Sequence, residues 1–341
     1  MKKILLYMAV LLGGIAGCCP GAAETARKEI GVQLYSLREL IGNAEKYAEN
    51  HEEVFKALAE FGYTSVEAAN YRDGLFYGVS PEQFKADVEA AGLRVMSSHV
   101  GRGLSKEELA SGDLSAALEW WKECIAAHKA AGMEYIVVPH IGLQESLADL
   151  QTYCRYLNEI GRLCRENGIL FGYHNHSHEY RKTEDKVMLD YMLENTDPEL
   201  VFFQMDVYWT VYGQAAPVEY FAKYPGRFTM LHIKDHYEIG QSGMVGFDAI
   251  FNNADKAGLR DIVVEIEGFS TGDWRTSMKM CADYLLDAPF VKASYRYIPA
   301  RVPQWLFLLK SRRGYFSYSG LALAGPELHW RHCARYVFIV M

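Results

Sequence analysis

Histidine and acidic residues directly follow apolar runs of this chain, and the densest group lies in residues 168–179. This segment reads GILFGYHNHSHE, so an apolar run typical of a strand buried on both faces stops at three histidines, an asparagine and a glutamate. Histidine-rich turns also occur as surface hydrogen-bonding groups. A functional interpretation therefore depends on whether other apolar runs end in the same way.

Seven of eight successive apolar runs do end in polar residues. These residues are Glu67, His99, His140, His174 with His176, Asp206, His232 with Lys234, and Glu265 with Glu267. Because side chains two positions apart on a strand point to the same side, each pair can face one common space. A single histidine would be explained as a satisfied core residue, but the recurrence favours a functional site.

The residue types indicate which chemistry such a site could perform. Two or more imidazoles with two carboxylates suit one divalent metal ion such as Mn, Co, Zn or Fe, and do not suit an all-oxygen calcium site. Such an ion would polarise a sugar carbonyl and stabilise the enediolate formed when the adjacent C–H loses its proton. The remaining His, Lys and Glu groups could act as general acid and base. A metal-free polar pocket held by hydrogen bonds is the alternative.

Eight predicted strands, each followed by a helical segment, must position these side chains. The strands are expected at residues 30–36, 63–67, 93–99, 134–140, 169–176, 200–209, 227–235 and 261–268. The helices are expected at residues 52–61, 81–91, 113–131, 145–167, 185–195, 216–224, 247–257 and 274–286. Eight such units predict a single-domain α/β fold, a (β/α)₈ TIM barrel over residues 28–292. A doubly wound open sheet would usually have a Gly-rich turn after its first strand, where this chain has QLYSLREL.

The segments outside the predicted barrel have different compositions. In residues 1–27, two lysines precede a short apolar stretch, and the sequence before Cys18 resembles a bacterial lipobox. We therefore expect an exported protein, either periplasmic or anchored as a lipoprotein through Cys18; ordinary cleavage near Ala23 or Ala26 is the alternative. Residues 293–341 lack any strand or helix period and are strongly basic. We interpret them as a frameshifted, read-through or disordered tail, with a basic appendage as the alternative.

The net charge limits the classes of possible partner, and the cysteine spacing limits the possible metal sites and disulfides. The net charge of -8 gives no general attraction to nucleic acid or to an anionic membrane, so membrane contact is expected only through the lipid anchor. None of the cysteines forms a CxxC or zinc-ribbon spacing. The four within the predicted barrel are expected to be buried free thiols, namely Cys124, Cys154, Cys164 and Cys281.

Four segments of the chain resemble the xylose isomerase-like TIM barrels known as sugar phosphate isomerases/epimerases. They are FGYHNHSHEY, LENTDPELVFFQMDVYW, YPGRFTMLHIKD and IVVEIEG. The resemblance implies one metal ion bound by side chains at the ends of strands five to eight, here His174, Asp206, His232 and Glu265. It also implies catalytic groups beside the metal, here His176, Lys234 and Glu267, and substrate contacts from Glu67, His99 and His140.

One position departs from the family pattern. Many of these isomerases and epimerases have a glutamate at the fifth-strand ligand position, where it works with the eighth-strand glutamate to move a proton. This chain has His174 there, so a two-glutamate relay is not available. Some relatives instead cleave 3-keto-glycosides by β-elimination, and export argues against a phosphorylated sugar. We therefore expect a metal-dependent sugar isomerase or epimerase, with a 3-keto-glycoside lyase as the alternative and a non-catalytic sugar-binding lipoprotein as the third possibility.

Overall fold

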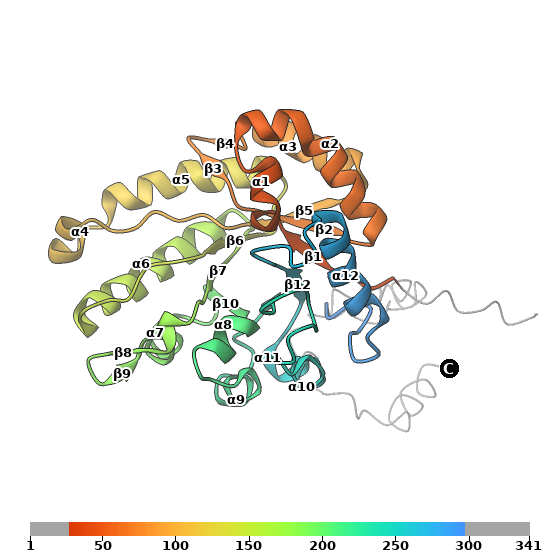
Figure 1. Ribbon diagram of the computed structural model, residues 1–341. Helices are drawn as coiled ribbons and strands as arrows, with labels where there is room; N and C mark the ends of the chain where they lie inside the picture. Colours follow the sequence, from red (N-terminus) through yellow and green to blue (C-terminus); the bar gives the residue numbers. More distant parts are fainter. Residues whose placement is uncertain (1–26, 297–341) are drawn as a thin grey trace, which may run out of the picture. The chain divides into compact units, whose positions relative to one another are not determined.

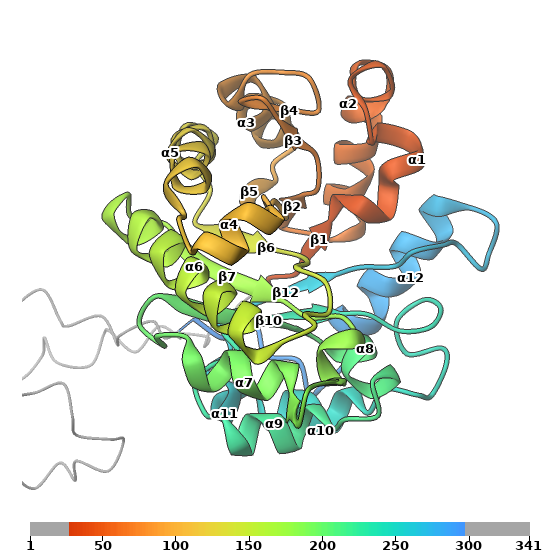
Figure 2. The same cartoon turned by 90° about the vertical axis from the view of Figure 1, so that its left-hand side faces the viewer.

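The computed structural model describes residues 27–296, and eight parallel strands in this range form a barrel (Figures 1 and 2). In chain order they are β1 (Gly31–Gln33), β2 (Ser65–Ala68), β5 (Arg94–Ser98), β6 (Tyr135–Val138), β7 (Leu170–His174), β10 (Val201–Asp206), β11 (Met230–Ile233) and β12 (Asp261–Val264). Their order around the sheet is β5-β2-β1-β12-β11-β10-β7-β6. A bridge between His99 and Val137 joins the two edge strands, which nearly closes the barrel. The predicted (β/α)₈ fold is confirmed.

Helices surround the barrel and connect its strands (Figure 2). The longer ones are α2 (Ala44–Phe61), α3 (Pro81–Ala90), α5 (Ser115–Ala130), α6 (Leu147–Glu166), α7 (Met188–Asn195), α9 (Pro217–Lys223) and α12 (Trp274–Asp287). Shorter ones are α1 (Arg38–Ile41), α4 (Lys106–Ser111), α8 (Val207–Tyr212), α10 (Phe247–Asn252), α11 (Ala254–Ala257), and the 3₁₀ helices η1 (Leu34–Leu37) and η2 (His178–Tyr180). Two small hairpins pair β3 (Tyr71–Arg72) with β4 (Leu75–Phe76), and β8 (Lys182–Thr183) with β9 (Lys186–Val187).

Local side-chain chemistry explains where helices begin and end. Ser80 precedes Pro81 at the start of α3, and its hydroxyl accepts a hydrogen bond from the backbone N–H of Gln83. Helix α2 ends at Gly62, whose φ of 107° lies in the left-handed region that glycine occupies at little cost. Such signals are readable in the sequence, and both boundaries lie within a residue or two of the predicted ones.

The structure differs from the predicted elements at several places. Helix α2 begins at Ala44 rather than at residue 52, and the strand predicted over 200–209 ends at Asp206, where α8 begins. The first strand ends at Gln33, because its side-chain oxygen accepts from the N–H of Tyr35 and turns the chain into η1. The segment predicted as a helix over 185–195 begins with β9 and becomes helical only at Met188. The helix predicted over 247–257 is two short helices separated at Asn253.

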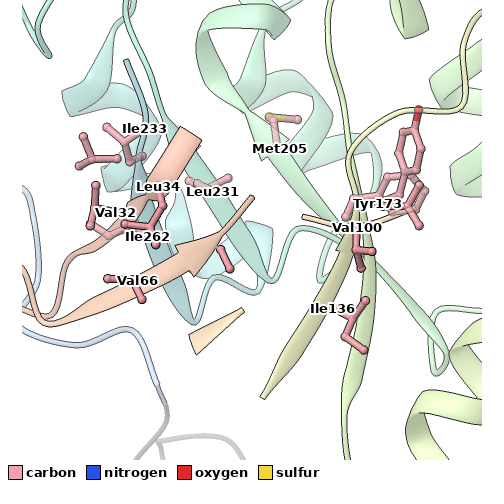
Figure 3. Close-up of a cluster of buried hydrophobic side chains, with 14 of the residues drawn as sticks. Val32, Leu34, Val66, Val100, Ile136, Tyr173, Met205, Leu231, Ile233 and Ile262 are labelled. Carbon is pink, nitrogen blue, oxygen red and sulfur yellow. The ribbon is translucent and has the colours of Figure 1, made fainter. Parts of the chain in front are cut away.

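Strand alternation divides the apolar core into two parts. Outward-facing side chains pack under the helices in one large cluster, of which Val32, Ile136, Leu231 and Ile233 are shown in Figure 3. Inward-facing side chains fill the barrel interior as a second cluster, which consists of Met96, Tyr135, Val137, Phe202, Met230 and Val263. The barrel is therefore a packed core whose polar groups gather above this apolar layer, at the carboxyl ends of the strands.

The opposite end of the barrel is closed by ion pairs. The guanidinium of Arg296 donates to both oxygens of Asp261 at 2.9 Å and to Glu134 at 2.9 Å, and Tyr135 Oη donates to Asp261 at 2.7 Å. Arg296 is the last described residue. Residues 1–26 and 297–341, which hold the predicted export segment and nearly all of the predicted tail, lie outside the described residues.

Two further predictions concern the cysteines and the membrane. Cys124, Cys154, Cys164 and Cys281 are buried free thiols, as expected. Burial raises the pKa of Cys154 to about 12, so this thiol has little nucleophilic thiolate character. Within residues 27–296, no helix combines the length and the apolar character needed to span a membrane.

Candidate metal centre

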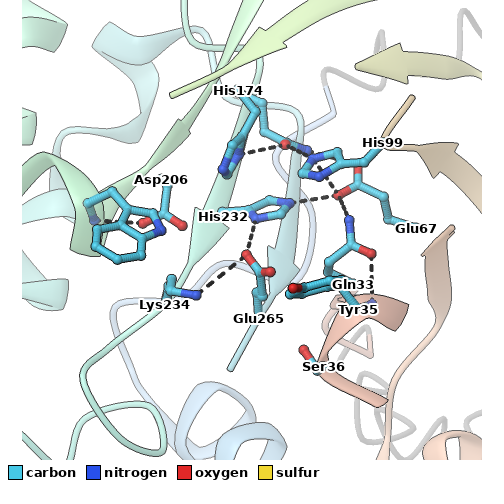
Figure 4. Close-up of polar contacts among 12 residues, drawn as sticks. Gln33, Tyr35, Ser36, Glu67, His99, His174, Asp206, His232, Lys234 and Glu265 are labelled. Atoms are coloured by element: carbon cyan, nitrogen blue, oxygen red, sulfur yellow. Dashed lines mark hydrogen bonds and ion pairs between the residues drawn. The ribbon is translucent and has the colours of Figure 1, made fainter. Parts of the chain in front are cut away.

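Four buried side chains converge at the carboxyl ends of neighbouring strands (Figure 4). They are His174 at the end of β7, Asp206 at the end of β10, His232 in β11 and Glu265 directly after β12. One possible ligand atom from each lies within 4.8 Å of the other three. We call these four side chains the quartet. They are the residues that the sequence predicted as metal ligands, and the structure brings all four together.

Register and alternation explain the convergence. Asp206 lies beside His232 in the pairing of β10 with β11, and Gln204 lies beside His174 in the pairing of β10 with β7. Parallel strands in this register bring their inward-facing ends to similar heights. The quartet therefore comes from four consecutive strands around one side of the barrel.

Asp206 carries the observation that fits a bound cation best. Its Oδ1 accepts from the backbone N–H of Trp209 at 2.8 Å and so caps α8. Its Oδ2 is buried and has no hydrogen-bond partner among the described residues. Burial raises the pKa of Asp206 to about 7. An unpaired buried carboxylate oxygen is costly, and a metal ion between the four groups would satisfy it.

The two imidazoles are held in defined orientations. His232 Nε2 lies 2.7 Å from Glu67 Oε1, and its Nδ1 lies 3.1 Å from Glu265 Oε2. His174 Nδ1 donates to Gln204 Oε1 at 3.1 Å, which leaves its Nε2 available. Burial opposes protonation of His232, but Glu67 and Glu265 on its two sides raise its pKa to about 10. The two carboxylates therefore favour the protonated form of His232 in this arrangement.

Glu67 lies in a polar layer directly beneath the quartet. It is fully buried, and its two oxygens accept hydrogen bonds from four side chains: Gln33 at 2.8 Å, His232 at 2.7 Å, Ser97 at 2.6 Å and Gln204 at 2.9 Å. Burial opposes its ionisation, but His99 and His232 lower its pKa to about 2. The sequence suggested a substrate contact for Glu67, whereas in this geometry the carboxylate anchors the imidazole of His232, as metal-bound histidines usually require.

Lys234 brings a positive charge to the same site. Its ammonium lies 2.8 Å from Glu267 Oε1, 3.7 Å from Glu265 Oε2 and 5.5 Å from the ring centre of Trp209. Burial lowers the pKa of Lys234, but Glu265 and Asp206 outweigh burial and raise it above its usual value. Lys234 is thus a charged, buried group beside the quartet. Its partner Glu267 lies half-exposed at the barrel mouth.

The other predicted residues lie around the quartet at different depths. His99 stacks on His232 with ring centres 4.9 Å apart, and its Nε2 lies 2.6 Å from Gln204 Oε1. His140 is exposed at the mouth, and His176 is partly buried between the ring of His174, 4.9 Å away, and that of Trp209, 5.8 Å away. All ten predicted site residues are therefore at one end of the barrel.

Three groups that matter in this geometry were not among the predicted site residues. Gln33 and Gln204 belong to the polar layer under the quartet, and His178 lies beside His140 and His176. Gln204 precedes Asp206 by two positions and so lies on the same face of β10, a signal that could have identified it. His178 follows His176 by two positions within residues 168–179, so the same spacing could have identified it, whereas Gln33 gave no such signal because the chain turns into η1 directly after it.

The donor set fits one divalent transition metal ion. Two imidazole nitrogens and two carboxylate oxygens suit Mn, Co, Fe or Zn, and one oxygen of the set has no partner within residues 27–296. His174, Asp206, His232 and Glu265 would hold this ion, which could act as a Lewis acid toward a carbonyl or hydroxyl oxygen.

Comparison with known proteins supports the (β/α)₈ barrel described above. Residues 55–284 match the model of the xylose isomerase-like TIM barrel family. A crystal structure of a sugar phosphate isomerase/epimerase from Parabacteroides distasonis is 35% identical and superposes with a TM-score of 0.70, covering 80% of this chain and 98% of its own.

Two further relatives are more distant. An inosose dehydratase from Geobacillus kaustophilus is 24% identical over 198 residues, which are 54% of this chain and 61% of the dehydratase. The match thus spans less than two thirds of that relative. A crystal structure of an IOLI protein with a bound zinc atom shares the fold at 12% identity and a TM-score of 0.57, covering 76% of this chain and 97% of its own.

Proposed function

Because the chain belongs to the xylose isomerase-like TIM barrel family, we propose that it is a metal-dependent enzyme that removes a proton next to the carbonyl group of a carbohydrate. The observation that carries this proposal is the quartet, with its unpaired Asp206 oxygen and with Lys234 beside Glu265. The bound ion would polarise the carbonyl and thereby acidify the neighbouring C–H.

The groups of the chain can be assigned to the proton transfers. Glu265 Oε2 is engaged by His232 and Lys234, whereas no hydrogen bond from residues 27–296 reaches its Oε1. This free oxygen is the proposed acceptor of the substrate proton. Lys234, kept charged by Glu265 and Asp206, is the proposed donor to a departing or carbonyl oxygen, and Glu267 holds its ammonium in place.

Elimination is the outcome that this arrangement supports best. Glu265 takes the proton from the carbon next to the ketone, the electrons of the C–H bond form a C=C bond, and the C–O bond at the next carbon breaks. The departing oxygen leaves with a proton from Lys234. One base and one acid suffice for this sequence. Since His174 occupies the fifth-strand position, the two-glutamate relay that would return a proton to another carbon or face is missing.

The proposed substrate is a small keto-sugar or a 3-keto-glycoside. An inosose dehydratase among the relatives is by name an enzyme of elimination, which agrees with this choice. If residues 1–27 are the export segment that the sequence predicts, the enzyme would act in the periplasm or on a lipid anchor, where sugar phosphates are scarce. Isomerisation or epimerisation is the second candidate, favoured by the name of the 35%-identical Parabacteroides structure.

Metal content and a substrate panel test the proposal. Protein loaded with Mn²⁺ alone is expected to hold one ion per chain, and His232→Ala is expected to lose it. His236→Ala, which changes a nearby exposed histidine outside the quartet, is expected to retain it. Protein that binds no divalent metal, or a His232→Ala variant with full occupancy, would refute the enzymatic mechanism.

The panel offers 3-keto-glycosides and inosose-type keto-cyclitols beside free aldoses and ketoses. Release of the aglycone or of water, with no interconversion of free sugars, is the expected result. Interconversion of free sugars without elimination would establish the isomerase or epimerase instead. Sugar binding without turnover, in metal-loaded protein, would indicate the non-catalytic sugar-binding protein.

A further inference from the structure

A second group of histidines lies at the barrel mouth, separate from the quartet. One ring nitrogen each from His140, His176 and His178 lies within 4.8 Å of the other two. We call these three side chains the histidine trio. Its ring centres are 4.9 Å apart between His140 and His178, and about 6 Å apart for the other two pairs. The trio shares no residue with the quartet, so the two groups can hold separate ligands.

The loop after β7 is folded to present two members of the trio together. The buried carboxylate of Glu179 accepts a hydrogen bond from Tyr173 Oη at 2.6 Å and another from the backbone N–H of His176 at 2.8 Å. These bonds draw the loop back on itself, so that the rings of His176 and His178 stack at an angle of 21°. His140 reaches them from the end of the adjacent strand β6.

The trio has a ring nitrogen that the surrounding protein does not satisfy. His176 Nδ1 is buried and has no hydrogen-bond partner among residues 27–296, and the buried His178 Nε2 has the carboxylate of Glu179 3.2 Å away. Burying an unpaired polar nitrogen is costly. A surface hydrogen-bonding turn gives this nitrogen of His176 no partner, whereas a ligand shared by the three rings could supply one.

We propose that the histidine trio binds a second divalent transition metal ion, beside the one held by the quartet. Three imidazoles with one side open are a donor set suited to zinc and similar borderline ions. Zinc–nitrogen bonds of about 2 Å place tetrahedral ligands about 3.3 Å apart, so the trio must contract by about 1–1.5 Å. The exposed side chain of His140 and the partly exposed one of His178 have the freedom to do so.

The chemistry of the two donor sets predicts different ion preferences. The quartet includes the carboxylates of Asp206 and Glu265, which suit Mn²⁺ as well as Zn²⁺. The trio has only nitrogen ligands, and the carboxylate of Glu179, whose Oε1 lies 3.2 Å from His178 Nε2, is already engaged by Tyr173 and by the backbone of His176. It should therefore bind Zn²⁺ and exclude Mn²⁺. An ion there would give the mouth a second Lewis acid close to the first.

Metal stoichiometry tests this inference without any activity assay. Untagged full-length protein is stripped with a chelator, dialysed against Zn²⁺ or Mn²⁺ alone, and measured by elemental analysis. The wild type is expected to hold two Zn²⁺ or one Mn²⁺ per chain. His140→Ala and His178→Ala should each hold one Zn²⁺ and still one Mn²⁺, and His236→Ala should match the wild type.

Asp206→Ala separates the two sites. This variant should keep one Zn²⁺ in the trio and lose all Mn²⁺, even if the proposed reaction is wrong. A wild type that holds a single Zn²⁺, lost in Asp206→Ala and kept in both trio variants, would overturn the second site while leaving the quartet intact. A single Zn²⁺ that survives in Asp206→Ala and is lost in His140→Ala would support the trio and refute the proposed metal-dependent function.

Discussion

Replacing Glu67 by glutamine removes one charge from the layer beneath the metal ligands and leaves the size of the side chain almost unchanged. The wild-type carboxylate accepts four hydrogen bonds, including one from His232 Nε2 at 2.7 Å and one from Ser97 Oγ at 2.6 Å. A glutamine amide offers one oxygen and one NH₂ group. The NH₂ group would stand where a carboxylate oxygen now accepts two hydrogen bonds, so two donors would lose their acceptor.

The expected loss of stability follows from those unpaired groups. A buried donor left without an acceptor costs about 1–3 kcal/mol, and two are affected. The hydroxyl of Ser97 can rotate and accept from the new NH₂ group, which lowers the sum. We expect Glu67→Gln to reduce the free energy of unfolding of the metal-free protein by about 3 kcal/mol.

The same change should weaken metal binding. His232 presents Nδ1 to the quartet because Glu67 fixes the proton on Nε2. Loss of such a supporting carboxylate typically costs about 10–100-fold in metal affinity. The affinity of Glu67→Gln for Zn²⁺ or Mn²⁺ should therefore fall by about that factor, although every ligand is retained.

The stability difference should depend on pH in a defined way. The pKa of Glu67 is lowered from 4.5 to about 2 on folding, so its contribution is full above pH 4.5 and lost as the pH falls toward 2. The pKa of His232 is raised from 6.5 to about 10, so its contribution is full below pH 6.5 and lost as the pH rises toward 10. The difference between wild type and variant should be largest between pH 4.5 and 6.5.

Urea denaturation of metal-free protein at pH 6 and competition titrations with a metal chelator measure the two effects. Glu238→Gln is the matched control, because Glu238 is an equally buried carboxylate that accepts from Ser270 and Ser277, away from the quartet. The control should lose stability and keep its metal affinity. If Glu67→Gln bound metal within twofold of the wild type, the supporting role of Glu67 would be wrong.

Two more outcomes follow from the structure. Metal binding must displace the proton of His232, whose pKa is raised to about 10, and part of the proton of Asp206, whose pKa is raised to about 7. The apparent affinity for Zn²⁺ in calorimetric titrations should therefore rise about tenfold or more per pH unit between pH 6 and 8. A pH-independent affinity would contradict the assigned ligands. Arg296→Ala should lower the free energy of unfolding by about 2 kcal/mol, because Asp261 is buried and loses its bidentate partner. Arg275→Ala, which breaks an exposed pair, should change urea denaturation by less than about 0.5 kcal/mol, and equal losses in both variants would refute the role of Arg296.

The sequence was sufficient for the fold and, through the family resemblance, for the four quartet residues. Continuous apolar strands separated by helical segments predict a parallel sheet covered by helices, and eight of them predict the barrel. Because side chains on a strand alternate with a period of two, the polar residue at each strand end could be assigned to the inner face. His174, Asp206, His232 and Glu265 were therefore among the candidates that alternation indicates, and the resemblance to the xylose isomerase-like TIM barrels selected these four as metal ligands.

Other features depended on contacts that the sequence does not encode locally. The first strand was predicted too long, because a side-chain hydrogen bond of Gln33 turns the chain early. The segment 247–257 was predicted as one helix, although the chain breaks it at Asn253. The histidine trio arises because Glu179 folds the loop after β7 toward the end of β6, which brings residues from two separate loops together.

The sequence by itself thus determined which face of each strand a side chain occupies. Only the tertiary structure decided how high in the barrel that side chain lies, because height depends on the register between neighbouring strands. A shift in the pairing of β2 with β5, at Val66 and Glu67, places the Glu67 carboxylate beneath the quartet and beside Ser97. Alternation fixes direction within one strand, whereas depth is a property of hydrogen bonds between strands far apart in the chain.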